Sequence, residues 1–297
     1  MNETGWWAQQ FEENRGHLRA VAYRILGSVS EADDAVQEAW LRLTRSGTAA
    51  IENLGAWLTT VVARVCLDTL RSRASRKEEA LESPGFQAPA SREGSDPERD
   101  AVLADSVGLA VLVVLERLNP AERIAFVLHD MFDVSFDEIA PILGRSPEAA
   151  RQLASRARRR VRGGDAPDQE AIERQRQVVN AFLAALRGGD FEGLIAVLDP
   201  DVVVRIDETA GRPGGPREIH GARAWASGAM AFRQYARSVE TMLVDGGVGL
   251  VWAPAGRLSR VLKFKFDGEK ITGVEIIADP VRLGEMELGV VGPDALR

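Results

Sequence analysis

The sequence SFDEIAPILGRSPEAARQL, at residues 135–153, predicts two helices joined by a tight turn. Gly144 is the residue best able to adopt the left-handed conformation that ends the first helix. Ser146 can cap the second helix, and Pro147 suits its first helical position. Because the turn is short, it holds the two helices at a steep angle, which is the geometry of a helix-turn-helix.

The second predicted helix has two different faces. Its apolar face is expected to pack inward and consists of Ala150, Leu153, Ala157 and Val161. Its polar face carries Glu148, Arg151, Gln152, Ser155 and Arg159. Such a helix fits the major groove of DNA, with its first polar residues against base edges and its later arginines against phosphates. The alternative is an ordinary helical hairpin with a solvated basic face.

The distribution of charge favours DNA binding. The whole chain has a net charge of −7, but residues 144–163 contain seven arginines and a single acid, Glu148. Because binding depends on where charges lie, a basic stripe on an acidic protein is compatible with a DNA partner.

Length and composition indicate a multidomain globular protein. A chain of 297 residues favours two or three domains, and 45% hydrophobic and 27% charged residues are ordinary values. The sequence has no apolar run of membrane-spanning length and no secretory signal at its start, so we expect a cytoplasmic protein without a membrane partner. The single cysteine, Cys66, is expected to be a small core residue, and no metal or cofactor is expected.

Two helical blocks and one mixed block follow each other along the chain. The first block, 7–76, contains a predicted helix from an N-cap at Ser30 to Thr44 and a second helix over Gly55–Arg73. A Pro-, Gly- and Ser-rich linker is expected over 77–97. The second block, 98–163, is expected to hold helices at 102–118, 120–130, 135–143 and 147–162.

The third block, 169–297, has an α+β pattern. A helix is expected at 171–186, followed by β-rich runs at 202–206, 248–252, 261–266 and 271–277. The run from Leu262 to Phe266 alternates apolar and basic residues, as a half-buried antiparallel strand does. The residues Asp267-Gly268-Glu269-Lys270 predict a hairpin turn between the last two runs.

Three separated stretches carry a family resemblance: ADDAVQEAWLRL at 32–43, AWLTTVVARVCLDTLRS at 56–72 and QLASRARR at 152–159. With them the chain resembles sigma-70 transcription initiation factors of the extracytoplasmic-function class. More narrowly, it resembles the subgroup with a C-terminal SnoaL-like domain, a cone-shaped relative of ketosteroid isomerase. The resemblance covers nearly the whole chain. It implies two all-α domains, sigma region 2 and the helix-turn-helix of sigma region 4, followed by an α+β cone.

The resemblance implies that core RNA polymerase is a partner, through the clamp helices of its largest subunit and through its flap. The clamp-binding residues would be Asp34, Gln37, Glu38 and Leu41. These positions share one helix face at spacings of three and four residues, so an acidic, partly apolar patch is expected there. Without the resemblance, a solvated helix face is the simpler interpretation.

The resemblance also implies promoter DNA as a partner at two places. The helix from Gly55 and the loop 46–54 would read and open the −10 element, with Asn53 in a pocket for a flipped base and Arg64, Arg71 and Arg73 on strand phosphates. The alternative for each arginine is a surface ion pair, such as Arg64 with Asp68. The −35 element would be read by Arg145, Ser146, Glu148, Arg151, Gln152, Ser155, Arg156 and Arg159.

The chain departs from the subgroup at three motifs. The linker reads LESPGFQAP at 81–89 in place of Trp-Leu-Pro-Glu-Pro, and DETAGR at 207–212 and ADPVRL at 278–283 replace two further motifs. We therefore expect the contacts of the linker with the C-terminal domain to differ here.

The third block offers no catalytic spacing. Its titratable candidates, Asp207, His220, Tyr235 and Asp279, form no recognisable acid–base pair, so no enzyme and no catalytic residue are predicted. We expect regulation by intramolecular contact, since tethering keeps this domain at high effective concentration near the others. Binding of an apolar small molecule is the alternative.

The sequence thus predicts a sigma factor that is modulated by its fused C-terminal domain. The alternative is a stand-alone helix-turn-helix regulator with a ligand-sensing cone. The acidic face around Gln37 separates these two hypotheses, because an independent regulator does not need it. A third possibility, an isomerase or hydrolase with a DNA-binding appendage, requires an acid–base pair inside the cone.

Overall fold

The computed structural model describes residues 3–46, 51, 53–81, 108–164, 168–211 and 217–291. Its residues group into two compact units. Among the described residues, the first unit comprises those of 3–81 and 115–158, and the second comprises those of 108–114 and 159–291. In the part of the chain that is described, no helix is long and apolar enough to cross a membrane.

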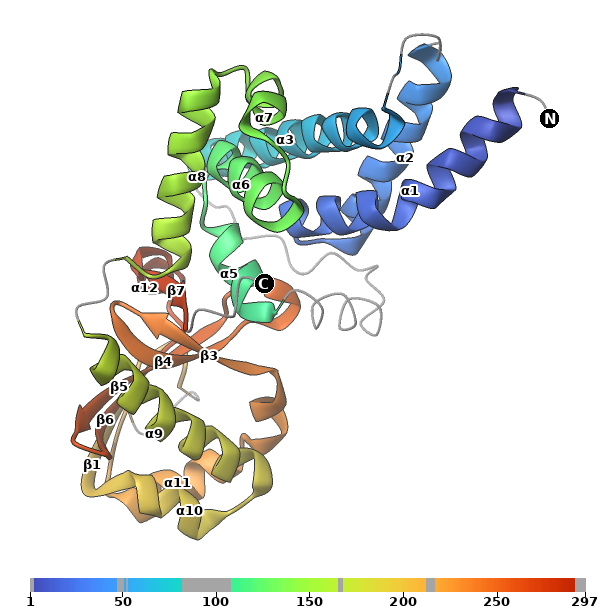
Figure 1. The fold of residues 1–297 in the computed structure, drawn as a ribbon. Coiled ribbons are helices and arrows are strands. Elements are labelled where there is room, and N and C mark those ends of the chain that lie inside the picture. The colour runs from blue at the N-terminus through green and yellow to red at the C-terminus, as the bar shows by residue number, and fades with distance from the viewer. Residues whose placement is uncertain are drawn as a thin grey trace. The chain divides into compact units, whose positions relative to one another are not determined.

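Three long helices form the N-terminal part of the first unit: α1 (Glu3–Leu26), α2 (Val29–Ser46) and α3 (Leu54–Leu81)(Figure 1). Their apolar faces meet around Leu18, Ile25, Leu43 and Leu58, which are fully buried. Cys66 lies in the same core, as expected, and burial raises the pKa of its thiol above the usual range.

The boundaries of these helices differ from the predicted ones. The α2 helix begins at Val29, and the hydroxyl of Ser28 accepts a hydrogen bond from the backbone N–H of Glu31 at 3.4 Å. The predicted N-cap at Ser30 is therefore wrong by two residues, because Gly27 turns the chain with a positive φ of 69° and Ser28 follows it directly. The α3 helix continues to Leu81, into the segment predicted as linker.

The remaining helices are short. They are α5 (Leu109–Glu116), α6 (Pro120–Phe126), the π-helix η1 (Val127–Met131), α7 (Phe136–Leu143) and α8 (Pro147–Val161). The single helix predicted over 120–130 is in fact α6 followed by the π-helical turn. Residues 102–107 of the predicted helix 102–118 lie outside the described residues.

In the first unit the two sets of helices are packed together: α3 contacts α6 and α7, and α1 contacts η1. Two arginines reach the last carbonyls of α1, which have no partner within the helix. Arg123 of α6 donates to the carbonyl of Ile25 at 3.0 Å, and Arg73 of α3 donates to that of Leu26 at 3.1 Å. Burial lowers the pKa of the Arg123 guanidinium to about 10.

The second unit is an α+β domain, as predicted. Helices α9 (Gln169–Gly188), α10 (Phe191–Val197) and α11 (Ala222–Met230) pack on a sheet of order β2-β1-β6-β5-β4-β3-β7(Figure 1). Strands β1 and β6 are parallel, and every other described pair is antiparallel. The strands are β1 (Leu198–Ile206), β2 (Glu218–His220), β3 (Val239–Val244), β4 (Gly247–Trp252), β5 (Arg260–Asp267), β6 (Lys270–Ile277) and β7 (Leu288–Val290). The 3-10 helices η2 (Arg233–Ser238) and η3 (Pro254–Gly256) and the helix α12 (Pro280–Glu285) complete the domain.

The predicted hairpin is present: β5 and β6 pair through Asp267 and Lys270, with Gly268 at a φ of 55° between them. The expected antiparallel strand is β5, and it pairs with β4 and β6.

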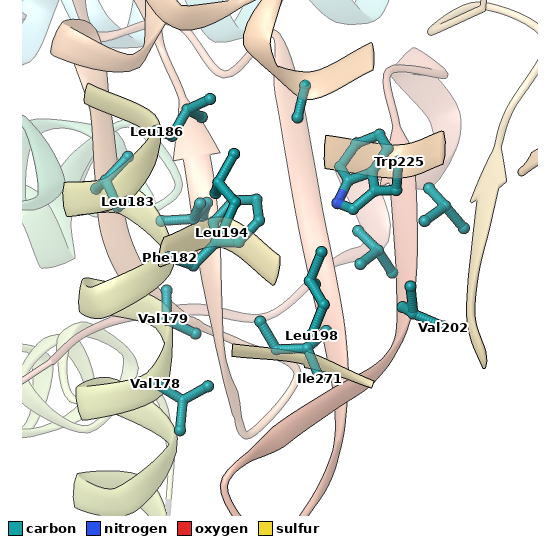
Figure 2. Close-up of a cluster of buried hydrophobic side chains, with 14 of the residues drawn as sticks. Val178, Val179, Phe182, Leu183, Leu186, Leu194, Leu198, Val202, Trp225 and Ile271 are labelled. Atoms are coloured by element: carbon teal, nitrogen blue, oxygen red, sulfur yellow. The ribbon is translucent and has the colours of Figure 1, made fainter. Parts of the chain in front are cut away.

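The space between these helices and the sheet is occupied by large apolar side chains. Figure 2 shows Phe182 of α9, Leu194 of α10 and Ile271 of β6 directed into one cluster, with Trp225 of α11 beside them. Phe182 is 1% exposed and Trp225 6%, and the ring of Phe182 lies 5.7 Å from that of Phe264.

Candidate nucleic-acid interface

The first helix of the helix-turn-helix is fixed at both ends by its own residues. The hydroxyl of Ser135 accepts from the N–H of Glu138 at 3.3 Å, and the Glu138 carboxylate accepts from the N–H of Ser135 at 3.2 Å, which completes a capping box. Gly144 ends α7 in the left-handed conformation with a φ of 63°. The hydroxyl of Ser146 then accepts from the N–H of Ala149 at 3.2 Å at the start of α8. The predicted turn is therefore confirmed.

The two faces of α8 lie as the sequence predicts. Ala150, Ala157 and Val161 are fully buried and Leu153 is 8% exposed. Glu148, Arg151, Gln152, Ser155 and Arg159 are exposed, together with Arg145 and Ser146 in the turn. Because its polar residues point to solvent over several turns, α8 presents a continuous face of a kind that fits a major groove.

Two arginines of the basic stripe have partners inside the first unit. The Arg156 guanidinium lies 3.3 Å from the carboxylate of Glu122, which is only 2% exposed, and Arg158 lies 2.5 Å from Asp130. These ion pairs hold α8 against α6 and η1. Arg156 therefore has a structural role in addition to the DNA contact predicted for it.

Glu148 lies in the first turn of α8. Its pKa is lowered by its backbone N–H, by the Ser146 hydroxyl and by the nearby charge of Arg151. The carboxylate is therefore ionised at neutral pH. It places one acceptor beside Arg151, and glutamate at such a position can accept from the amino group of cytosine.

A second exposed surface lies on α2. Asp34 and Gln37 are exposed, and Leu41 is 37% exposed, a high value for a large apolar side chain. Glu38 is half-buried, and its carboxylate accepts from Arg42 at 2.9 Å. The face predicted for polymerase binding is therefore accessible in the first unit.

A groove adjoins this face between α1 and α2. It has a volume of about 830 Å³, and its lining includes Phe11, Gln37 and Trp40. The rings of Phe11 and Trp40 are 4.9 Å apart, and Arg19 bridges to Asp33 at 2.7 Å nearby. Gln37 thus belongs both to the exposed face and to an indented surface with aromatic side chains.

The residues predicted for the −10 element are only partly brought together. Asn53 is exposed, and its side-chain oxygen accepts from the N–H of Ala56 at 3.1 Å, so it caps α3. Residues 47–50 and 52 of the predicted pocket loop lie outside the described residues.

The three arginines predicted for that element differ in their surroundings. Arg64 and Arg71 are exposed on α3, and Asp68 lies 4.0 Å from Arg71. The ion pair suggested for Asp68 thus forms with Arg71. Arg73 is less exposed, donates to the carbonyl of Leu26 and pairs with Glu31, so it stabilises the packing of α3 on the α1–α2 turn.

In the second unit, the candidate base Asp207 accepts hydrogen bonds from three backbone N–H groups: Ala210 at 2.6 Å, Ala278 at 2.7 Å and Asp279 at 2.9 Å. Partial burial opposes ionisation, but these donors and the charge of Arg282 together lower its pKa. A carboxylate held in this way is a weak base and serves as a structural link between β1 and the segment after β6.

The other candidates lie elsewhere. The Asp279 carboxylate caps α12 through the N–H groups of Val281 and Arg282, both at 3.0 Å. His220 is exposed on β2, and the Tyr235 ring lies 5.9 Å from that of Trp252 and is 47% exposed. No acid–base pair is formed by these four residues in the described contacts.

Sequence reasoning missed Phe136 and Arg123. Phe136, the first residue of α7, lies under the side chain of Arg151. Its position between Ser135 and Asp137, at the start of a predicted helix, is the only local feature of the sequence that pointed to Phe136. Arg123 gave none, because a single arginine in a helix is usually exposed.

Comparison with known proteins gives a consistent result. Residues 10–76 match the family model of sigma-70 region 2, and residues 108–161 match that of sigma-70 region 4. The chain is 43% identical over 220 residues to the ECF RNA polymerase sigma factor SigJ of Mycobacterium tuberculosis, covering 72% of this chain and 69% of that protein. It is 33% identical over 282 residues to the probable ECF RNA polymerase sigma factor SigI of the same species, covering 93% and 95%.

A solved structure is also similar. The crystal structure of Mycobacterium tuberculosis SigJ shares 34% identity with this chain, covers 93% of it and 97% of the solved chain, and has a TM-score of 0.44. The length and identity of the sequence matches, together with the two matched regions, decide the family. The chain belongs to the extracytoplasmic-function group of RNA polymerase sigma factors.

Proposed function

We propose that this sigma factor joins core polymerase to promoters through two surfaces of its first unit. The α2 face of Asp34, Gln37, Glu38 and Leu41 binds the clamp helices, and the exposed face of α8 reads the −35 element. The observation that carries the proposal is the exposure of Arg151 and Gln152 on α8, with the α2 face accessible in the same unit. Region 4 in addition contacts the flap of the polymerase.

The −10 element is bound by α3 and by the loop before it. Arg64 and Arg71 are exposed on α3, where they can approach strand phosphates. Asn53 contributes to the pocket for a flipped base, because the cap that it forms fixes both the start of α3 and the end of the loop. Initiation of transcription on chromosomal DNA places the protein in the cytoplasm.

The C-terminal domain modulates the other two and performs no reaction of its own. The proposal is supported by the engagement of Asp207 and Asp279 in backbone hydrogen bonds and by the large side chains in the core. Intramolecular contact remains the favoured mode, since the tether makes even a weak contact effective.

Run-off transcription with purified core polymerase on genomic fragments tests the proposal as a whole. The full chain should co-purify with core polymerase and start transcripts at defined sites. Leu41→Asp should weaken co-purification, whereas the matched variant Leu41→Met should not. A full chain that binds a defined DNA sequence tightly but never binds polymerase would establish the stand-alone regulator in place of this proposal.

The role of the C-terminal domain is tested in the same assay. A chain without residues 169–297 should give a different amount of transcript or a different promoter preference from the full chain. Identical transcription from both proteins, at equal concentration and with equal polymerase binding, would remove modulation from the proposal.

A further inference from the structure

The guanidinium of Arg151 is held over an aromatic side chain from the neighbouring helix. Its central carbon lies 5.2 Å from the ring centroid of Phe136, the first residue of α7. At this distance the cation is attracted by the negative charge on the ring face. Arg151 is exposed on α8 and Phe136 is half-buried, so the ring forms a fixed base under a side chain that points to solvent.

Phe136 is in turn supported by a histidine. The ring centroids of Phe136 and His129 are 3.9 Å apart, and the two ring planes are tilted by 32° to one another. Nδ1 of His129 lies 3.0 Å from the carbonyl oxygen of Val134, so this contact sets the orientation of the imidazole. The side chains of His129 from η1 and Arg151 from α8 therefore both contact Phe136 of α7.

The backbone around His129 is irregular. His129 lies in the π-helix η1, an element that is rare and often marks functional sites. Asp133, which follows, has a φ of 54°, unusual for a residue with a side chain. A π-helical turn contains one more residue than an α-helical turn, which rotates later side chains by on the order of 100°. His129 lies inside this irregular segment and Phe136 comes after it, and their two rings are in contact.

We propose that Phe136 is a positioning residue that orients Arg151 for a base edge in the −35 element. The proposal rests on the promoter-reading role proposed for α8. A bidentate contact from arginine to guanine depends on the angle of the guanidinium, whereas a phosphate contact tolerates many angles. If Arg151 is already restrained in the free protein, it loses less conformational entropy when it binds DNA. This gain in binding free energy applies to the base contact, which needs a defined guanidinium orientation.

The structural alternative is that Phe136 only fills space under α8. Phe136→Leu separates the two, because leucine keeps an apolar side chain at this position and removes the aromatic ring. Phe136→Tyr keeps the ring and should restore the effect. Phe132→Leu is the matched control, since Phe132 is an aromatic residue of the same segment that packs on Arg24 and His17.

The experiment uses holoenzyme reconstituted from the full chain and core polymerase. The probes are a promoter duplex selected by run-off transcription and duplexes with every single base-pair change in its −35 element. Phe136→Leu should reduce the preference for the native base pair at one position by about 2- to 5-fold, the size of an exposed cation–π contact. The salt dependence of affinity should stay the same, because the phosphate contacts are unchanged.

Other results would overturn the proposal. It fails if Phe136→Leu leaves every preference unchanged while Arg151→Ala alters one, or if Phe132→Leu has the same effect as Phe136→Leu. It also fails if the loss from Phe136→Leu is undiminished in the Arg151→Ala background, because a positioning residue acts only through its partner. If Arg151→Ala itself changes no base preference, the role proposed for α8 in reading the −35 element is rejected, and the positioning role of Phe136 is rejected with it. In the other cases only the positioning role of Phe136 is rejected.

Discussion

The guanidinium of Arg123 donates a hydrogen bond of 3.0 Å to the carbonyl oxygen of Ile25, and this bond joins the region 4 helices to the end of α1. Arg123 is 5% exposed, and the nearby charge of Glu116 favours its ionised form. The described packing of α3 on α6 and α7 thus includes a buried polar contact as well as apolar surface. Because this hydrogen bond joins α6 to α1, the stability of the region 4 helices depends on that of the N-terminal helices.

Arg123→Ala should lower the free energy of unfolding of the first unit by about 1.5–3 kcal/mol, because it leaves the Ile25 carbonyl buried without its donor. Urea denaturation followed by circular dichroism measures this. Arg64→Ala, at an exposed position on α3, is the control and should change stability by less than about 0.5 kcal/mol. Equal denaturation midpoints for both variants would contradict a structural role for Arg123.

Arg151→Ala should cost about 1–3 kcal/mol of discrimination at one base pair of the −35 element, because the exposed guanidinium is placed for a base contact. Competition binding of holoenzyme to promoter duplexes measures it. Arg159→Ala should instead weaken binding to all sequences equally and reduce the salt slope by about one, as loss of a phosphate contact does. The assignment would be wrong if the two variants behaved alike.

Ser135→Ala should destabilise the first unit by about 0.5–2 kcal/mol, because it removes the hydroxyl that caps α7. Thermal unfolding of the full chain detects the change. Ser72→Ala, at an exposed position inside α3, provides the comparison and should raise stability or leave it unchanged. A capping role is excluded if both variants melt at the temperature of the native chain.

Asp207 should make the C-terminal domain sensitive to acid. Its pKa is lowered in the folded state, so its contribution to stability is fully present above the unfolded pKa and is lost as the pH falls through the folded value. Asp207→Asn should cost about 2 kcal/mol at neutral pH and flatten the fall of stability in acid. Denaturant midpoints from neutral pH down to about 3 test this, and an unchanged acid profile would refute it.

Leu41→Ala should weaken binding to core polymerase by about 5-fold, the loss expected from truncating one exposed apolar contact of about 1 kcal/mol. Fluorescence anisotropy of labelled protein titrated with core enzyme measures the affinity. Glu12→Ala, on α1 in the lining of the groove, tests whether the contact surface extends from α2 onto α1. Affinity that fell equally for both variants would mean that the contact surface is not centred on α2.

The parts of the structure that the sequence predicted are those controlled by local chemistry. Gly144 and Ser146 act on their own helix ends, so their capping roles follow from neighbouring residues. The burial of Ala150 and Ala157 follows from helical periodicity. The family resemblance, which rests on three separate stretches, supplied the domain order.

The features that sequence reasoning missed depend on tertiary packing. No local sequence pattern encodes the π-helical turn at η1 or the contact of His129 with Phe136. Strands β2 and β7 are short and gain their pairing partners from distant parts of the chain. The ion pairs of Arg73 and Arg156 form with residues far along the sequence, so the sequence did not reveal their structural roles.

The apolar packing at the centre of the C-terminal domain bears on where a regulatory signal acts on this domain. Phe182, Leu194 and Trp225 belong to one buried apolar cluster between the helices and the sheet of this domain. We therefore expect a signal to act on the outer face of the domain, through a macromolecule that binds there or through modification of an exposed side chain. A screen for the inducer should therefore test protein partners before a library of metabolites.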